Sequence, residues 1–376
     1  MRSSNGHYNR VHAGSLDPDL STNEPGAVLM LRQYVESAKR AVTLGVALCA
    51  ALAAASANAQ TAARATPEAW RAIVAAAQKE GRVVMYHATA PAVADRVKAD
   101  FEKAYPGISF EWQRGNSGAI SAKLDQERVT GADGADVAIT TEFPWFRNRA
   151  KDNELKPLVG PATAGWPGAH LYEGSIAVIA LEPAVMMYNT NLVKTPITSY
   201  RDALRPEFRG KIGMLDLTGT LMVSFYDWLE KTNGADYLVA LAAQQPKIYI
   251  SVVPGAQSAA AGEFAIAHYV NMSTAAAMLA QGAPVKIVFP QPTFSIRWPM
   301  GAVAWSKRPN AALVLTDYLM SVRGQTAWNG GGESASPLPN IPGSQDNKTL
   351  NAVDLAPYTP EIVKAYTTKW NGLFKK

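Results

Sequence analysis

The sequence predicts an α/β protein of two lobes, in which each lobe has a mostly parallel sheet flanked by helices. Strand-like and helix-like segments alternate from residue 66 onward. This alternation is typical of parallel sheets with right-handed crossovers. The segment 60–376 is also longer than a single hydrophobic core usually organises, and this length favours two lobes.

The segment at 1–59 is expected to be a signal peptide with an upstream pre-sequence, removed on export. Its basic residues are Arg32, Lys39 and Arg40. They precede an apolar run without a charge at 41–55 and the small-residue cleavage site Ala57-Asn58-Ala59. The run is shorter than the roughly 20 residues of a membrane-spanning helix. We therefore expect translation from Met30, cleavage before Gln60 and localisation in the periplasm.

Composition excludes several functional classes. Cys49 is the only cysteine and lies in the segment expected to be removed, so we expect neither disulfides nor a cysteine metal site. The formal net charge is +5 and no run of five or more like charges occurs, which argues against nucleic-acid binding. A weakly positive field favours an anionic ligand.

The first half of the chain carries the clearest element signals. The predicted elements are helices at 67–80, 91–105 and 118–130 and strands at 82–86, 108–113 and 135–140. Thr66 as the N-cap, Pro67 at the first helical position and Gly81 after the last turn bracket the first helix. Ligands bind beyond the carboxyl ends of strands in such sheets, and here those ends are residues 87–89, 114–117 and 140–142.

A second round of elements follows a passage rich in proline and glycine at 157–174. The predicted strands lie at 176–181, 184–188, 212–215, 285–289 and 300–305. The predicted helices lie at 221–231, 235–243, 263–281 and 311–320, the third interrupted near Asn271. Nothing repeats at a fixed period, so a repeat architecture is not expected.

Local phrases in a fixed order connect the chain to a known family. They are EGRVVMY at 80–86, FEKAYPGI at 101–108, GADV at 134–137, MYNTNL at 187–192, FRGKI at 208–212, GAPV at 282–285 and DYLMS at 317–321. Behind an export signal, these phrases make the chain resemble the iron(III)-type (family 1) extracellular solute-binding proteins of bacterial ABC importers. The resemblance covers nearly all of residues 60–376.

The resemblance implies the type II periplasmic-binding-protein fold, with two crossing segments near 174–188 and 285–291. Lobe 1 would comprise 66–178 plus 287–345, and lobe 2 would comprise 179–286 plus 346–376. The lobes would close over a small-molecule solute by a hinge motion. The closed form would then dock on the membrane permease of an ABC importer. We expect a monomer without a cofactor.

The candidate ligand-binding residues lie at strand ends and near the second crossing segment. They are His87, Ala88, Thr89, Asn116, Ser117, Thr141, Glu142, Thr218, Gly219, Thr220, Tyr269, Asn271, Phe294, Arg297 and Trp298. Two predicted helices begin after Asn116 and Thr220, where free N–H groups attract an anion. Arg297 is a candidate for pairing with an acid group, although a solvated charge is an equal alternative. Tyr269 lies where the family places its ligand-contacting tyrosine.

The type of solute follows from the residues at the family's metal position. Ferric-binding members use an adjacent tyrosine pair with, commonly, a histidine and a glutamate, whereas this chain reads His268-Tyr269. Trivalent iron prefers several anionic oxygens. The main hypothesis is therefore a small organic anion, a carboxylate or a phosphate or phosphonate. Ferric iron held by Glu142 and Tyr269, with His87 or His268 as uncertain further ligands, is the alternative.

An enzyme and a periplasmic sensor are the two other functional classes to consider for such a fold. The motifs GxSxG, HExxH, GxxxxGK[ST] and GxGxxG are absent from the sequence, so no catalytic residue is expected. A periplasmic sensor, for which the solute is only a signal, has the same sequence features as a transport receptor.

Overall fold

The computed structural model describes residues 64–350 and 352–375, except for the side chain of Thr349. The predicted signal peptide, its cleavage site and Met30 lie outside these residues. The described chain forms one sheet in the order β2-β1-β3-β10-β5-β8-β6-β7, and β4 and β9 also pair with β5. Among the described residues, no helix combines the length and the apolar character that crossing a membrane requires.

Three parallel strands form one half of the sheet, as the sequence predicts. β1 (Arg82–His87) lies between β2 (Ser109–Arg114) and β3 (Val137–Ile139). α2 (Pro67–Glu80) precedes β1, α3 (Pro91–Ala104) and α4 (Ser117–Thr130) connect the strands, and α5 (Phe143–Lys151) follows β3. The Thr66 hydroxyl accepts a hydrogen bond from the Ala69 N–H at 3.2 Å, and Gly81 ends α2 at a φ of 73°.

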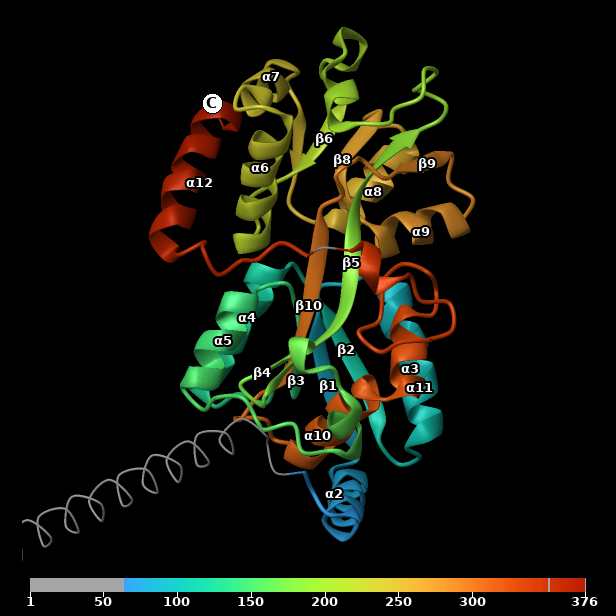
Figure 1. Cartoon of the computed structure of the whole chain (residues 1–376), viewed down its shortest axis with the longest axis vertical. Coiled ribbons are helices and arrows are strands. Elements are labelled where there is room, and N and C mark those ends of the chain that lie inside the picture. Colours follow the sequence, from blue (N-terminus) through green and yellow to red (C-terminus); the bar gives the residue numbers. More distant parts are fainter. Residues whose placement is uncertain (1–63, 351, 376) are drawn as a thin grey trace, which may run out of the picture. The chain divides into compact units, whose positions relative to one another are not determined.

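β5 (Ile176–Asn189) runs through both halves of the sheet (Figure 1). Its first part pairs antiparallel with β4 (Leu171–Tyr172) and β10 (Ser295–Ala302), and its last part with β8 and β9. The two separate strands predicted at 176–181 and 184–188 are therefore wrong. The ladder continues across Glu182 and Pro183, which lie opposite Ile296 and Ser295.

The other half of the sheet contains β6 (Ile212–Leu215), β7 (Lys247–Tyr249), β8 (Ile266–Asn271) and β9 (Val285–Val288). Its helices are α6 (Thr220–Asn233), α7 (Tyr237–Ala243), α8 (Val252–Ala261) and α9 (Met272–Ala280). The helix predicted at 263–281 is wrong in its first part. Residues 266–271 are a continuous buried strand, and short buried runs show no periodicity that separates strand from helix.

After β9, the chain returns to the half of the sheet that contains β1, β2 and β3. β9 pairs with the last part of β5, whereas β10 pairs with its first part, so the chain crosses between the halves in the segment that joins β9 to β10. The strand predicted at 300–305 accordingly begins earlier, at Ser295. α10 (Pro309–Met320) and α11 (Val322–Asn329) pack on α2 and α3. A third passage is marked by the bridge between Ala352 and Ser295.

The C-terminal helix α12 (Pro360–Phe374) packs against α6 and α7, as Figure 1 shows. Five short 3₁₀ helices complete the described chain, at Pro161–Gly165, Gly168–His170, Tyr200–Leu204, Pro206–Phe208 and Asn347–Thr349.

Candidate functional site

A pocket with an empty volume of about 450 Å³ lies where the two halves of the sheet meet. One half contributes Ala88, Arg114, Gly115, Asn116, Ser117, Thr141 and Glu142. The other contributes Leu215, Thr218, Gly219, Leu221, Met222, Ile250, Ser251, Val252, Tyr269 and Asn271, and β10 adds Trp298. These residues follow the carboxyl ends of the parallel strands, which is the location that the sheet topology favours for a ligand.

Most of the candidate residues come together in this pocket. Those that line it are Ala88, Asn116, Ser117, Thr141, Glu142, Thr218, Gly219, Tyr269, Asn271 and Trp298. Those that do not are His87, Thr89, Thr220, Phe294 and Arg297. Whether the lining residues contact a solute stays a prediction.

Two candidates lie outside the pocket lining because successive side chains at the end of β1 point to opposite faces of the sheet. Ala88 faces the pocket, whereas His87 is buried with its ring 5.1 Å from that of Trp112. Burial, with a further contribution from Arg114, lowers the pKa of His87 to about 3, so its imidazole is neutral. Thr89 is also buried and takes part through its carbonyl oxygen rather than its hydroxyl.

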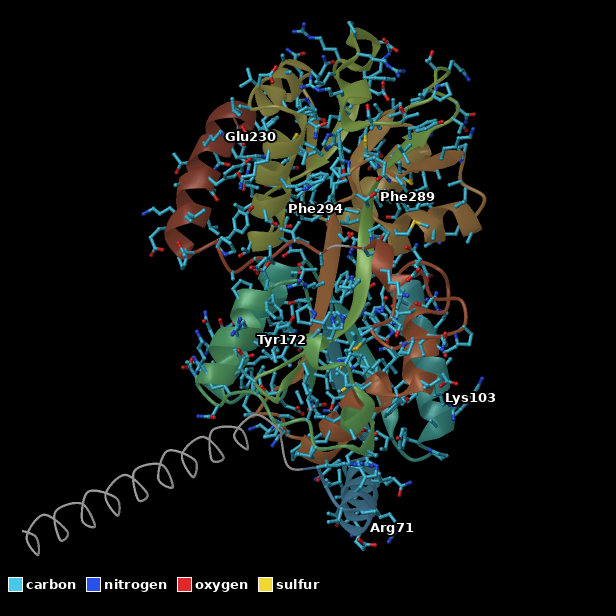
Figure 2. All side chains as sticks on the ribbon, in the orientation of Figure 1. Arg71, Lys103, Tyr172, Glu230, Phe289 and Phe294 are labelled. Carbon is cyan, nitrogen blue, oxygen red and sulfur yellow. The ribbon has the colours of Figure 1, made fainter. Side chains whose placement is uncertain are left out.

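Phe294 and Arg297 lie outside the pocket lining for different reasons. Phe294 packs edge-on against Phe225 and Trp228 in the core, and Figure 2 shows it beside the upper end of β10 in that view. Arg297 lies opposite Leu181 in the β5–β10 ladder and lines a separate cavity with His170. Trp298, the next residue, faces the pocket because successive side chains of a strand point to opposite faces.

The cationic residue of the pocket is Arg114, at the end of β2, which was not among the sequence-based candidates. Its Nε donates to the Thr89 carbonyl oxygen at 3.0 Å, and its Nη1 donates to the Ser251 hydroxyl at 3.3 Å. No carboxylate among the described residues forms an ion pair with it. Burial lowers the pKa of Arg114 from its usual value, although a guanidinium keeps its charge in proteins. Its position before Gly115 and the start of α4 is the signal that could have identified it.

Glu142 reaches from the end of β3 to the start of α6. Its Oε2 accepts a hydrogen bond from the Thr220 N–H at 3.4 Å. Its Oε1 is buried and has no partner among the described residues. Burial raises the pKa of Glu142, and the hydrogen bonds from Thr220 oppose this shift. The predicted candidate Thr220 therefore contributes to the site through Glu142.

Two glycines allow the halves of the sheet to approach each other closely. A Cβ atom on Gly219 would lie 2.1 Å from Glu142 Oε1, and one on Gly118 would lie 2.6 Å from the Thr218 carbonyl oxygen. Both distances are far below van der Waals contact, so any side chain at either position requires the neighbouring group to move.

The wall of the pocket formed by Trp298 is fixed by a buried carboxylate. Trp298 Nε1 donates to Glu182 Oε2 at 2.7 Å, and the Ser273 N–H at the start of α9 donates to Oε1 at 2.7 Å. Burial raises the pKa of Glu182 to about 7, against the effect of these hydrogen bonds. Glu182 lies on β5, so it joins the long crossing strand, β10 and α9.

For the alternative of ferric iron, the pocket offers one carboxylate and one phenol, those of Glu142 and Tyr269. Burial raises the pKa of Tyr269 well above its usual value, which disfavours the phenolate that iron binds. His268 is buried elsewhere, with Nε2 2.8 Å from the Tyr237 hydroxyl. No group of three or more His, Cys, Asp or Glu in the described part of the chain is placed to hold a metal ion.

A sheet with two halves joined by β5 and β10, and a polar pocket where the halves meet, define a two-lobed binding protein of the type II periplasmic fold. The family model described as bacterial extracellular solute-binding protein matches residues 146–359, and the chain belongs to this family. It is a solute-binding protein, as the resemblance predicts.

Solved structures share the fold at low sequence identity. The substrate-binding protein of an ABC transporter from Agrobacterium tumefaciens is 18% identical with a TM-score of 0.71, over 80% of this chain and 97% of that one. AfuA from Actinobacillus pleuropneumoniae, bound to fructose-6-phosphate, is 20% identical with a TM-score of 0.64, over 79% and 99%. Iron-bound HitA from Pseudomonas aeruginosa is 19% identical with a TM-score of 0.59, over 78% and 98%. No curated protein sequence matches the chain significantly.

Proposed function

We propose that the protein is exported through a cleaved signal peptide and, in the periplasm, captures a small organic anion for the permease of an ABC importer. The solute carries a carboxylate, phosphate or phosphonate group. The protein acts as a monomer, and it binds the solute without catalysing a reaction.

The observation that carries this proposal is the Arg114 guanidinium, which has no carboxylate partner among the described residues. It lines the pocket beside Asn116 and the first turn of α4, where backbone N–H groups also favour an anion. A half-buried cation without a carboxylate partner is costly unless a ligand supplies the negative charge. AfuA, which shares the fold, has a phosphorylated sugar as its bound ligand.

Closure of two lobes is part of the proposal. We assign lobe 1 to residues 66–178 plus 287–345 and lobe 2 to 179–286 plus 346–376. The packing of α12 against α6 and α7 supports the assignment of the C-terminal segment to lobe 2. The hydrogen bond from Arg114 to Ser251 joins residues of the two assigned lobes, which supports a closed state of the cleft.

Replacing Arg114 by Gln tests the proposal. We expect the substitution to weaken the binding of an anionic solute by about 1.5–3 kcal/mol, the scale of a hydrogen bond to a charged group. Mass spectrometry of the molecules that co-purify with the native protein identifies the solute, and isothermal titration of ligand-stripped protein measures its affinity.

Arg297→Gln is the matched control, since it removes a guanidinium that lines a different cavity. It should leave the affinity unchanged. An equal loss in both variants, or no small anion bound by the wild type, would refute the proposal.

Ferric iron remains the second candidate because Glu142 and Tyr269 line the same pocket. Titration with ferric citrate decides between the two. Tight binding that Tyr269→Phe abolishes, together with no response to carboxylates or phosphates, would establish iron as the cargo.

A further inference from the structure

We infer that Glu142 makes the pocket selective for a solute that carries one anionic group for Arg114 and, at a distance from it, a hydroxyl or ammonium group that donates to Glu142. A solute with a second anionic group is rejected. This inference rests on the proposed function and names the solute class within it.

The first argument is the unsatisfied oxygen. Glu142 is 8% exposed, and its Oε1 has no hydrogen-bond partner in the described part of the chain. Buried polar atoms in folded proteins nearly always have a partner. A residue that lines a ligand pocket can obtain the missing partner from the ligand, and a carboxylate oxygen requires that partner to be a donor.

The second argument concerns the start of α6. The first free N–H group of this 14-residue helix, that of Thr220, already faces Glu142 Oε2 at 3.4 Å. The positive end of the helix is thus occupied by a carboxylate from the opposite half of the sheet. The hydrogen bonds from Thr220 favour the ionised form of Glu142 against the effect of burial on its pKa. A second anionic group of the solute would approach this carboxylate, and like charges repel strongly where little water remains to screen them.

The third argument is that the two charges come from different strand ends, Arg114 from β2 and Glu142 from the segment after β3, and these strands lie on opposite sides of β1. Arg114 is held by Thr89 and Ser251, whereas Glu142 is held by Thr220. No ion pair joins Arg114 to Glu142 among the described residues, so each remains available to a separate group of the solute.

Two matched sets of probes test the inference on the wild-type protein. The first set is butyrate, 4-aminobutyrate and succinate, and the second is ethyl phosphate, phosphoethanolamine and phosphoglycolate. Within each set the anionic group is constant, and the second group is absent, a donor or an anion. Isothermal titration of ligand-stripped protein at neutral pH should give the donor-bearing member an affinity at least about tenfold above the other two.

Glu142→Gln should abolish this discrimination. The neutral amide removes the repulsion, so the dianionic member of each set should bind within about threefold of the donor-bearing one. Glu142→Asp keeps the charge on a shorter side chain, so it should retain the rejection of dianions while it loses affinity for the donor. Glu68→Gln, at an exposed site on α2, is the matched control and should behave as the wild type.

The outcomes separate this inference from the proposed function. If no probe of either set binds to the wild type, the proposed anion site is wrong. If anions bind and Arg114→Gln weakens them, but the members of each set bind alike, then the proposed function stands and the selectivity assigned to Glu142 is wrong.

Discussion

Arg308 and Asp136 form a buried ion pair, which connects the segment between β10 and α10 to the start of β3. Arg308 Nε donates to Asp136 Oδ2 at 2.8 Å, and the two side chains are 7% and 0% exposed. The Val84 N–H and the Ser306 hydroxyl also donate to the Asp136 carboxylate, at 2.7 and 2.6 Å. The carboxylate is therefore fully enclosed by donors, of which the guanidinium is the only charged one among the described residues.

We expect Arg308→Met to lower the free energy of unfolding by roughly 3–5 kcal/mol, because it leaves the Asp136 charge buried without its counter-ion. Urea denaturation followed by circular dichroism measures the change. Arg71→Met removes an arginine whose pair with Glu68 is 73% and 74% exposed, and Figure 2 shows Arg71 on the outer helix α2. This control should change the free energy by less than about 0.5 kcal/mol. Equal effects at the two sites would contradict the assignment.

At the scale of elements, β5 carries a buried titratable group, Glu182, within its span. The carboxyl group is buried between β10 and the start of α9, and Glu333 adds an unfavourable negative charge. Its pKa is about 7 in the folded protein and 4.5 as the ordinary value. The folded state thus binds the proton more tightly than the unfolded state does.

The sign of the pH dependence follows from this difference. The contribution of Glu182 to stability is complete below pH 4.5 and decreases as the pH rises through about 7. The free energy of unfolding of the wild type should therefore decrease relative to that of Glu182→Gln by roughly 1–3 kcal/mol across this interval. Denaturation of both proteins at several pH values gives the slope of the difference. A difference that does not change with pH would show that Glu182 stays ionised.

Elements with local signals could be predicted from the sequence, and elements defined by tertiary contacts could not. The cap residues Thr66 and Gly81 fix both ends of α2 by short-range hydrogen bonds, and their types alone suggest that role. β8 carries no such signal, because its six residues are all buried and only pairing with β5 and β6 makes them a strand.

The candidate site follows the same division. The strand ends that contain Asn116, Thr141 and Glu142 could be located because strand order determines them. The orientation of Arg297 could not, since it depends on the register of β10 against β5 and on the irregularity after Trp298.

At the scale of the whole molecule, the approach of the two halves across the pocket depends on Gly219. Its φ of 165° is an extended conformation that any residue adopts, so only the missing side chain matters. The Cβ of Gly219→Ala would meet Glu142 Oε1. We expect this substitution to weaken solute binding by roughly 1–3 kcal/mol, since overpacking would hold the halves apart.

Gly168→Ala is the control, because a Cβ there meets nothing within 4 Å. Small-angle scattering should show that Gly219→Ala is expanded when the solute is present and that the control is compact. Unchanged affinity and compactness in Gly219→Ala would mean that the pocket does not require this close contact.

Trp298 gives the protein an intrinsic optical reporter. The chain has nine tryptophans, and among the described residues Trp298 is the one whose side chain lines the pocket. Its indole is buried and held by Glu182, so its orientation is fixed while a solute in the pocket changes the polarity next to the ring. Its ultraviolet emission therefore reports occupancy directly, and an unlabelled sample suffices to screen solutes in a fluorimeter.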